Sequence, residues 1–267
     1  MHGNEQAAIV EAETYGKVHP GVVMLAAPRG VAAEQYRVLR QRLVPSLAAG
    51  IKRIAITSTT AGEGRTTTAV NLALALAAGG RRRVLLLDAD VRAAGRSWPL
   101  HQVLGLSPQH GLVDVVREEQ TLEATLWRFG PEALSVLPAG KTQDPHAIFS
   151  SPRLASTIAA CADRADVVLL DAPPILPTAD ALSLLEHVDA LLLVVEAGRT
   201  PRELIAHALS LLPPVRILGV VLQRAEADLG AQRALHARHD RRARRQLPPV
   251  APVAPASPPP RSAVEKR

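Results

Sequence analysis

Short runs of aliphatic residues alternate along this chain with segments of helical length, and this alternation limits the fold most strongly. Several runs are apolar at every position, which is typical of parallel strands that are covered on both faces. The alternation predicts an α/β fold with a doubly wound, mostly parallel sheet. Ser151 as an N-cap and Pro152 at the first helical position favour one helix start. The predicted strands are 53–58, 84–88, 134–137, 167–171, 190–195 and 217–222, and the predicted helices are 31–43, 66–78, 152–164, 178–187 and 201–212.

The predicted elements define one folded domain with a different kind of sequence on either side. We expect residues 29–230 to form this domain. Residues 1–28 show no sustained periodicity and are expected to be an arm or a linker. Residues 231–267 are rich in arginine and proline, so we expect an extended, disordered tail.

The composition indicates an aliphatic core in a protein of the cytoplasm. Hydrophobic residues make up 47% of the chain but aromatic residues only 2%. No run approaches the roughly 18 apolar residues of a membrane span, and the N-terminus lacks the apolar core of a signal peptide. The single cysteine, Cys161, excludes an internal disulfide and is expected to be packed in the interior.

The positive charge of the chain is concentrated near its C-terminus. Residues 233–267 hold nine Lys or Arg and two acids, a net +7 that leaves the rest of this +6 chain at −1. The tail can bind an anionic membrane surface, where each cation contributes about 1 kcal/mol, or it can stay solvated. Nucleic acid is not an expected partner, because the tail has no aromatic residue for base stacking.

A glycine-containing loop follows the first predicted strand and leads into a helix. Backbone N–H groups of such a loop, together with the helix N-terminus, bind phosphate oxygens. A threonine hydroxyl at the helix start binds Mg²⁺ in a P-loop, and Thr66 has that position. An ordinary glycine turn before a core helix would give the same local pattern. The predicted nucleotide contacts in this loop are Thr60, Ala61, Gly62, Glu63, Gly64, Arg65, Thr66 and Thr67.

Aspartates end two other predicted strands. Asp88 and Asp90 lie at the end of the second strand, and Asp171 ends the fourth. The carboxyl ends of parallel strands form the ligand-binding edge of such a sheet, so these side chains should lie near the loop. Carboxylates there hold Mg²⁺ directly or through water, and one can accept a proton from an attacking hydroxyl. An aspartate at a strand end can also be a helix cap or a turn former. We predict Thr66, Asp88 and Asp171 as metal ligands, and Asp88, Asp90 and Arg65 as catalytic residues.

Three motifs occur in the order found in one known family. They are Ala61-Gly62-Glu63-Gly64-Arg65-Thr66-Thr67, Leu86-Leu87-Asp88-Ala89-Asp90-Val91-Arg92 and Leu169-Leu170-Asp171-Ala172-Pro173-Pro174. They resemble the first Walker motif, the variant second Walker motif and the Walker B segment of the bacterial tyrosine autokinases of capsule and exopolysaccharide biosynthesis. The likeness extends from about residue 33 to residue 224. It implies the variant-Walker P-loop fold, which MinD-like and ParA-like ATPases share, with ATP and Mg²⁺ as ligands.

The resemblance also implies partners and a location. One partner is a transmembrane polysaccharide-export adaptor whose cytoplasmic end activates the kinase, which places the protein at the inner face of the plasma membrane. The other is a second copy of the chain, because the family forms rings through an E-x-x-R-x-x-R helix. That spacing is present as Glu34, Arg37 and Arg40, which lie on one helical face. A solvated helix with an internal ion pair is the alternative.

Three features depart from the family pattern. Arg65 replaces the phosphate-loop lysine, and a planar guanidinium is not equivalent to a compact ammonium in a tight cradle. Tyr15 and Tyr36 are the only tyrosines, so the C-terminal tyrosine cluster that the family phosphorylates is missing and the usual autophosphorylation is not expected. Gln223 stands where the family has an asparagine near the base, and we predict a purine contact from it.

Three functions remain open at this stage. The motifs favour an active ATP-dependent tyrosine kinase or ATPase in polysaccharide assembly. Arg65 and the missing tyrosine cluster favour an impaired member of the family that regulates export as a scaffold. A positioning ATPase shares the variant second motif, but such proteins carry a lysine where this chain has Thr60.

Overall fold

The computed structural model describes residues 8–10, 18–92, 98–130, 134–176 and 179–225. These residues belong to one compact unit, Met1–Ala225. The predicted tail, 231–267, lies outside the described residues. The strands are β1 (Ala8–Val10), β2 (Arg53–Ser58), β3 (Val84–Asp88), β4 (Trp127–Phe129), β5 (Leu134–Leu137), β6 (Val167–Asp171), β7 (Ala190–Glu196) and β8 (Arg216–Gln223). The helices are α1 (Val23–Ala26), α2 (Val31–Ala48), α3 (Arg65–Ala77), α4 (Leu100–Val103), α5 (Leu112–Val116), α6 (Leu122–Thr125), α7 (Pro145–Phe149), α8 (Pro152–Arg164), α9 (Asp180–Leu185) and α10 (Arg202–Ser210).

The strands form a single sheet in the order β1-β4-β5-β3-β6-β2-β7-β8. All neighbouring pairs are parallel except β4 and β5. The prediction of a doubly wound, mostly parallel α/β sheet is therefore confirmed. The sequence reading missed β1 and β4, because strands of three residues are too short to show a period.

Successive residues of the central strands face opposite sides of the sheet and build two apolar cores. In β2, Ile54 and Ile56 belong to one core and Ala55 to the other. In β3, Leu86 belongs to the first core and Leu85 to the second. Because side chains alternate along a strand, a strand that is apolar at every position supplies both cores. The first is named here the α3-side core and the second the α8-side core.

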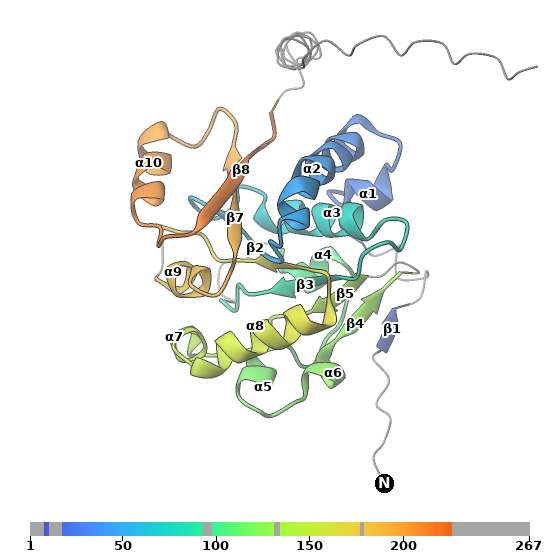
Figure 1. Ribbon diagram of the computed structural model, residues 1–267, viewed down its shortest axis with the longest axis vertical. Coiled ribbons are helices and arrows are strands. Elements are labelled where there is room, and N and C mark those ends of the chain that lie inside the picture. Colours follow the sequence, from blue (N-terminus) through green and yellow to red (C-terminus); the bar gives the residue numbers. More distant parts are fainter. Residues whose placement is uncertain (1–7, 11–17, 93–97, 131–133, 177–178, 226–267) are drawn as a thin grey trace, which may run out of the picture. The chain divides into compact units, whose positions relative to one another are not determined.

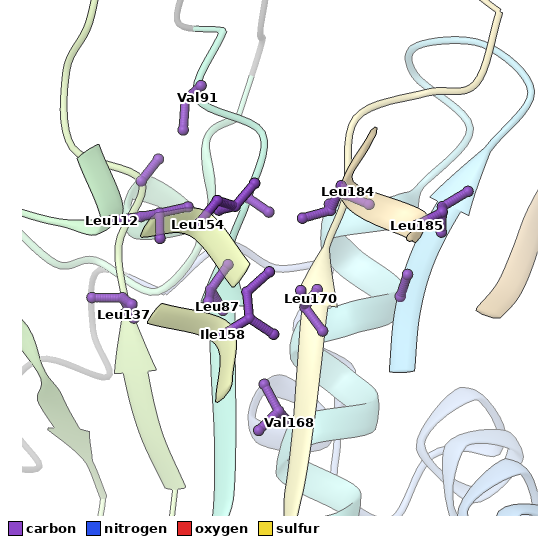
Figure 2. Packing of buried hydrophobic residues seen from close by; sticks show 14 of the residues in the cluster. Leu87, Val91, Leu112, Leu137, Leu154, Ile158, Val168, Leu170, Leu184 and Leu185 are labelled. Atoms are coloured by element: carbon purple, nitrogen blue, oxygen red, sulfur yellow. The ribbon is translucent and has the colours of Figure 1, made fainter. Parts of the chain in front are cut away.

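Helices cover the sheet on both faces, as Figure 1 shows. Residues of α2, α3 and α4 are buried in the α3-side core. Residues of α5, α7, α8, α9 and α10 are buried in the α8-side core. Figure 2 shows this second core, where Leu154 and Ile158 of α8 lie beside Leu87, Val168 and Leu170 of the strands. Cys161 is buried there as predicted, and burial raises the pKa of its thiol to about 12.

Two predicted helix boundaries show which signals decide a helix end. The start of α8 is confirmed: Ser151 is the N-cap, its hydroxyl accepts a hydrogen bond from the Arg153 N–H, and proline follows in the first turn. The predicted helix 31–43 is too short, because α2 continues past Pro45 to Ala48. Leu43 and Leu47 both pack on the α3-side core, and this packing stabilises the helix beyond the proline.

Part of the segment expected to be an arm or a linker contributes to the folded unit. Ala8–Val10 pairs with β4, and the Val22 side chain is fully buried in the α3-side core. The described residues between 18 and 30 also include α1. None of the helices in the described part of the chain has both the length and the apolar character that a membrane crossing needs.

Candidate nucleotide site

The loop between β2 and α3 has the backbone of a phosphate-binding loop. Gly62 and Gly64 have φ values of 86° and 92°, in the left-handed region that favours glycine. Gly64 is the N-cap of α3, so the positive end of the α3 dipole and its first N–H groups face the loop. A β-carbon at Gly64 would lie 3.1 Å from Cγ of Gln223. The residues predicted from the glycine pattern therefore lie together at the start of α3.

The loop is held in shape by a buried glutamate. Glu63 is 3% exposed, and its Oε2 accepts a hydrogen bond from the Thr60 N–H at 3.0 Å. The hydroxyl of Thr200 donates to the other carboxylate oxygen. The Ser58 hydroxyl donates to the Thr60 carbonyl at 2.6 Å. Thr200 was not predicted from the sequence, since it lies 137 residues from Glu63 and belongs to no motif.

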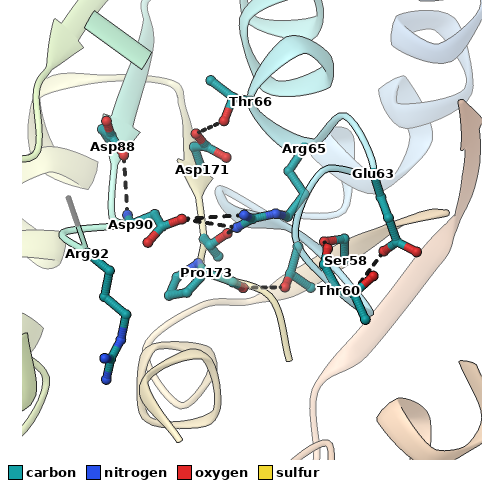
Figure 3. Close-up of polar contacts among 12 residues, drawn as sticks. Ser58, Thr60, Glu63, Arg65, Thr66, Asp88, Asp90, Arg92, Asp171 and Pro173 are labelled. Atoms are coloured by element: carbon teal, nitrogen blue, oxygen red, sulfur yellow. Dashed lines mark hydrogen bonds and ion pairs between the residues drawn. The ribbon is translucent and has the colours of Figure 1, made fainter. Parts of the chain in front are cut away.

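The predicted metal ligands are brought together by neighbouring elements. The Thr66 hydroxyl donates to Oδ2 of Asp171 at 2.7 Å (Figure 3). Asp88 is the register partner of Asp171 on the adjacent parallel strand. Asp88 and Asp171 are fully buried. The first turn of α3 and the ends of β3 and β6 thus meet at one point, as the strand-end argument predicted.

Arg65 extends from the start of α3 toward the variant second Walker motif after β3, which contains Asp88 and Asp90. Its guanidinium donates to Oδ2 of Asp90 at 3.4 Å and to the Ala172 carbonyl. Both side chains are buried, with 8% of Arg65 and 4% of Asp90 exposed. The Asp90 N–H donates to Oδ1 of Asp88 at 3.2 Å. The only cation predicted for the phosphate loop is therefore paired with a buried carboxylate of the same site.

The variant second Walker motif also contacts α9. Nε of Arg92 donates to Oδ2 of Asp180 at 2.5 Å, and Asp180 is almost completely buried. In β2, the Thr57 hydroxyl donates to the Pro173 carbonyl at 2.7 Å. These contacts fix the loops after β3 and β6 relative to the phosphate loop.

Gln223 lies beside the phosphate loop but its amide is engaged within the protein. Its Nε2 donates to the Tyr36 hydroxyl at 2.8 Å and to the Thr68 hydroxyl at 2.6 Å. Burial raises the pKa of the Tyr36 hydroxyl, and its contacts with Gln223 and Thr68 offset part of that rise. The side-chain amide of Gln223 thus donates its hydrogen bonds to Tyr36 and Thr68. Its contact with a purine base stays a prediction.

The residues predicted for self-association form contacts within the chain. Nη1 of Arg37 donates to Oε2 of Glu34 at 3.1 Å, and Nη2 donates to the Pro28 carbonyl at 2.5 Å. Nη1 of Arg40 donates to the Ala75 carbonyl near the end of α3 at 3.1 Å. The contact between Arg37 and Glu34 is the internal ion pair of the alternative interpretation of this helix. Self-association through these residues stays a prediction.

The donor set fits Mg²⁺ bound together with a nucleotide. Mg²⁺ takes oxygen ligands, usually one or two carboxylates with waters and substrate phosphates. Thr66, Asp171 and Asp88 supply such oxygens next to the phosphate loop. Among the described residues, no group of three or more His, Cys, Asp and Glu side chains forms a site that would hold a metal by itself. The oxygens of Thr66, Asp88 and Asp171 suit an ion that also takes phosphate oxygens of a bound nucleotide as ligands.

Known proteins resemble this chain over most of its length. The CbiA family, described as the CobQ/CobB/MinD/ParA nucleotide binding domain, matches residues 54–247. The tyrosine-protein kinase YwqD of Bacillus subtilis (strain 168) is 32% identical over 211 residues, 77% of this chain and 86% of that protein. The succinoglycan biosynthesis transport protein ExoP of Rhizobium meliloti (strain 1021) is 33% identical over 213 residues, 77% of this chain but only 26% of that protein. The solved BceF tyrosine kinase domain has a TM-score of 0.68 and 26% identity, covering 82% of this chain and 91% of that one.

Proposed function

Because this chain belongs to the bacterial tyrosine kinases within the CobQ/CobB/MinD/ParA nucleotide-binding family, we propose that it binds Mg-ATP and acts in capsular or exopolysaccharide biosynthesis. The names of its relatives support both parts: one is a tyrosine-protein kinase and another a succinoglycan transport protein. The observation that carries the proposal is the 2.7 Å hydrogen bond between Thr66 and Asp171. It joins the phosphate loop to the end of β6, where a P-loop protein needs its metal.

Each part of the site has a distinct role in this proposal. The loop N–H groups and the N-terminus of α3 bind phosphate oxygens. Thr66 and Asp171 hold Mg²⁺, with Asp88 beside them. The bound ion neutralises charge on the phosphates. Asp88 would also accept the proton of an attacking hydroxyl, and Glu63 would keep the loop in its binding conformation.

A nucleotide-binding scaffold without phosphoryl transfer is the second candidate, and Arg65 supports it. Its guanidinium is paired with Asp90 and the Ala172 carbonyl. To reach a phosphate, it must give up these contacts in a buried site. Arginine also lacks the compact ammonium of lysine. In this candidate function, nucleotide binding would change the conformation that a partner protein recognises. No phosphate would be transferred.

Both candidate functions require the protein to bind ATP, so ATP binding is tested first by titration calorimetry. We expect the wild type to bind ATP in the micromolar range with Mg²⁺ and at least tenfold more weakly without it. Asp171→Asn should remove most of the Mg²⁺ dependence, while Asp163→Asn, on the exposed side of α8, should not change it. Equal affinities with and without Mg²⁺, or in wild type and Asp171→Asn, would contradict the proposal.

Turnover then separates kinase from scaffold. ATP hydrolysis and tyrosine phosphorylation are compared between the wild type and Arg65→Lys at saturating Mg-ATP. Turnover by the wild type supports the kinase. Binding without turnover in the wild type, with turnover gained in Arg65→Lys, assigns the loss of catalysis to arginine and supports the scaffold.

The partners in this proposal follow the family. A transmembrane export adaptor would recruit the protein to the inner face of the membrane, and copies of the chain would associate through Glu34, Arg37 and Arg40. Self-association through these residues exchanges the intramolecular ion pair for contacts with a second copy. Light scattering over a range of concentrations measures the molar mass of the wild type and of Arg37→Ala. If both are monomers at every concentration, self-association through these residues is excluded.

A further inference from the structure

A basic groove lies at the end of α3 that is remote from the phosphate loop. Its volume is about 550 Å³, and it is formed by α2, the end of α3 and the turn that precedes β3. The 13 residues of α3, at about 1.5 Å per residue, separate it from the nucleotide site by roughly 20 Å. Three arginines, Arg40, Arg81 and Arg82, line it together with the apolar residues Val44, Leu76 and Ala78.

The arginines of this groove differ in how they are used within the fold. Arg40 donates to the Ala75 carbonyl at 3.1 Å, so it stabilises the C-terminal end of α3 and its head group is held in place. The next residue after the pair, Arg83, is bound to Asp166 at 2.9 Å. The side chains of Arg81 and Arg82 form no ion pair or hydrogen bond with any residue that the structure describes. Within the described part of the chain, their guanidinium groups are therefore not held by a partner as those of Arg40 and Arg83 are.

The lining indicates which anion fits. Guanidinium groups bind carboxylates and phosphates through paired N–H donors. None of the described residues that line the groove is aromatic or acidic, so they give a nucleotide base nothing on which to stack. A concave site does not accept the flat surface of a bilayer. Val44 and Ala78 are half-buried and offer an apolar surface that aliphatic side chains can cover, above Leu76, which is buried. Inorganic phosphates gain nothing from such a surface.

We propose that this groove binds an acidic peptide segment of a partner protein. Carboxylates of the segment pair with Arg81 and Arg82, and its aliphatic side chains pack on Val44 and Ala78. The site is separate from the nucleotide site and independent of whether the protein transfers phosphate.

Fluorescence anisotropy of a labelled ten-residue peptide of alternating Glu and Leu tests this proposal. We expect saturable binding to the full chain that weakens as salt rises, because exposed charge pairs are screened. The double variant Arg81→Glu/Arg82→Glu should bind at least tenfold more weakly. A matched double variant, Arg202→Glu/Arg216→Glu, changes two exposed arginines elsewhere and should bind within threefold of the wild type.

The controls distinguish the groove from general attraction to a positive protein. Circular dichroism of both double variants checks that each is folded. The same peptide with Gln in place of Glu should not bind. Equal weakening in both double variants, binding of the Gln peptide, or no binding by the wild type would overturn the proposal. Pyrophosphate and phosphatidylserine vesicles are tested in the same way. If either binds the wild type but not Arg81→Glu/Arg82→Glu, while the Glu-Leu peptide binds both proteins equally, the groove is a phosphate site and the peptide proposal is overturned.

Discussion

Arg65 shows how one residue can change the chemistry of a phosphate-binding loop. Its guanidinium lies between Oδ2 of Asp90 and the Ala172 carbonyl, inside the site rather than in solvent. Removing one partner of a buried ion pair leaves a charge that is costly to keep away from water. Loss of either partner alone should therefore destabilise the phosphate loop, and within the pair the charge of Arg65 is neutralised by Asp90.

A double-mutant cycle measures this contribution. Arg65→Met is expected to lower the free energy of unfolding by about 3–5 kcal/mol, because Asp90 loses its buried cation. The double variant Arg65→Met/Asp90→Asn should recover part of this loss, with a coupling energy of about 1–3 kcal/mol. Urea unfolding measures all four proteins, and Arg202→Met serves as an exposed control. Strictly additive losses would show that the pair is not coupled.

At the scale of elements, Asp189 connects the start of β7 to the start of β2. Its Oδ2 accepts hydrogen bonds from the N–H groups of Lys52 and Arg53 at 3.0 and 2.8 Å. Its Oδ1 accepts from Nε and Nη2 of Arg53 at 3.1 and 2.5 Å. Burial alone would raise the pKa of Asp189, but the hydrogen bonds from Arg53 and Lys52 outweigh it and hold this pKa below its usual value.

This lowered pKa makes part of the stability dependent on pH. A carboxyl whose pKa is lower in the folded state contributes stability above its unfolded pKa of about 3.9, and the contribution is lost as pH falls through the folded value. Asp189→Asn should therefore lower the free energy of unfolding by about 1–3 kcal/mol at pH 7. The difference from wild type should shrink as the pH falls below about 4.

Urea unfolding between pH 7 and the acid limit of folding checks the sign of this dependence. Asp163→Asn removes a carboxylate from an exposed position of α8 and should follow the wild-type curve. A stability difference for Asp189→Asn that stays constant with pH would show that the charge of Asp189 is not responsible.

At the scale of the folded unit, two cores share one sheet. Leu85 and Leu86 are neighbours in β3, fully buried on opposite faces. Because every central strand contributes to both cores, neither core can melt without exposing the sheet that supports the other. We infer that residues of this unit unfold in one cooperative transition.

Two single substitutions test this cooperativity. Leu85→Ala and Leu86→Ala are each expected to lower the free energy of unfolding by about 2–5 kcal/mol, from lost burial and the cavity that remains. Both should keep a single transition in which circular dichroism and calorimetry agree. Leu209→Ala, at a site that is 38% exposed, should change stability by less than about 0.5 kcal/mol. A second transition in only one of the two core variants would show that the cores melt separately.

The parts of this protein that its sequence determined are those encoded by local signals. Runs that are apolar at every position indicated the buried parallel strands, because such strands are covered on both faces. Gly62 and Gly64 marked the phosphate loop, since its backbone enters a region that other residues avoid. Ser151 and Pro152 marked the start of α8. The positions of Thr66 and Asp171 in their motifs were enough to predict that they meet.

Only the tertiary structure decided which distant groups complete these local features. Glu63 meets Thr200, and Gln223 meets Tyr36, across separations of 137 and 187 residues that no periodicity encodes. The three-residue strands β1 and β4 exist because they pair with neighbours, and each is too short to carry a signal of its own. The direction of Arg65 and the groove around Arg81 depend on how α3 packs against the chain around it. A sequence records each residue with its neighbours along the chain, but the charges and contacts of a site are set by its neighbours in space.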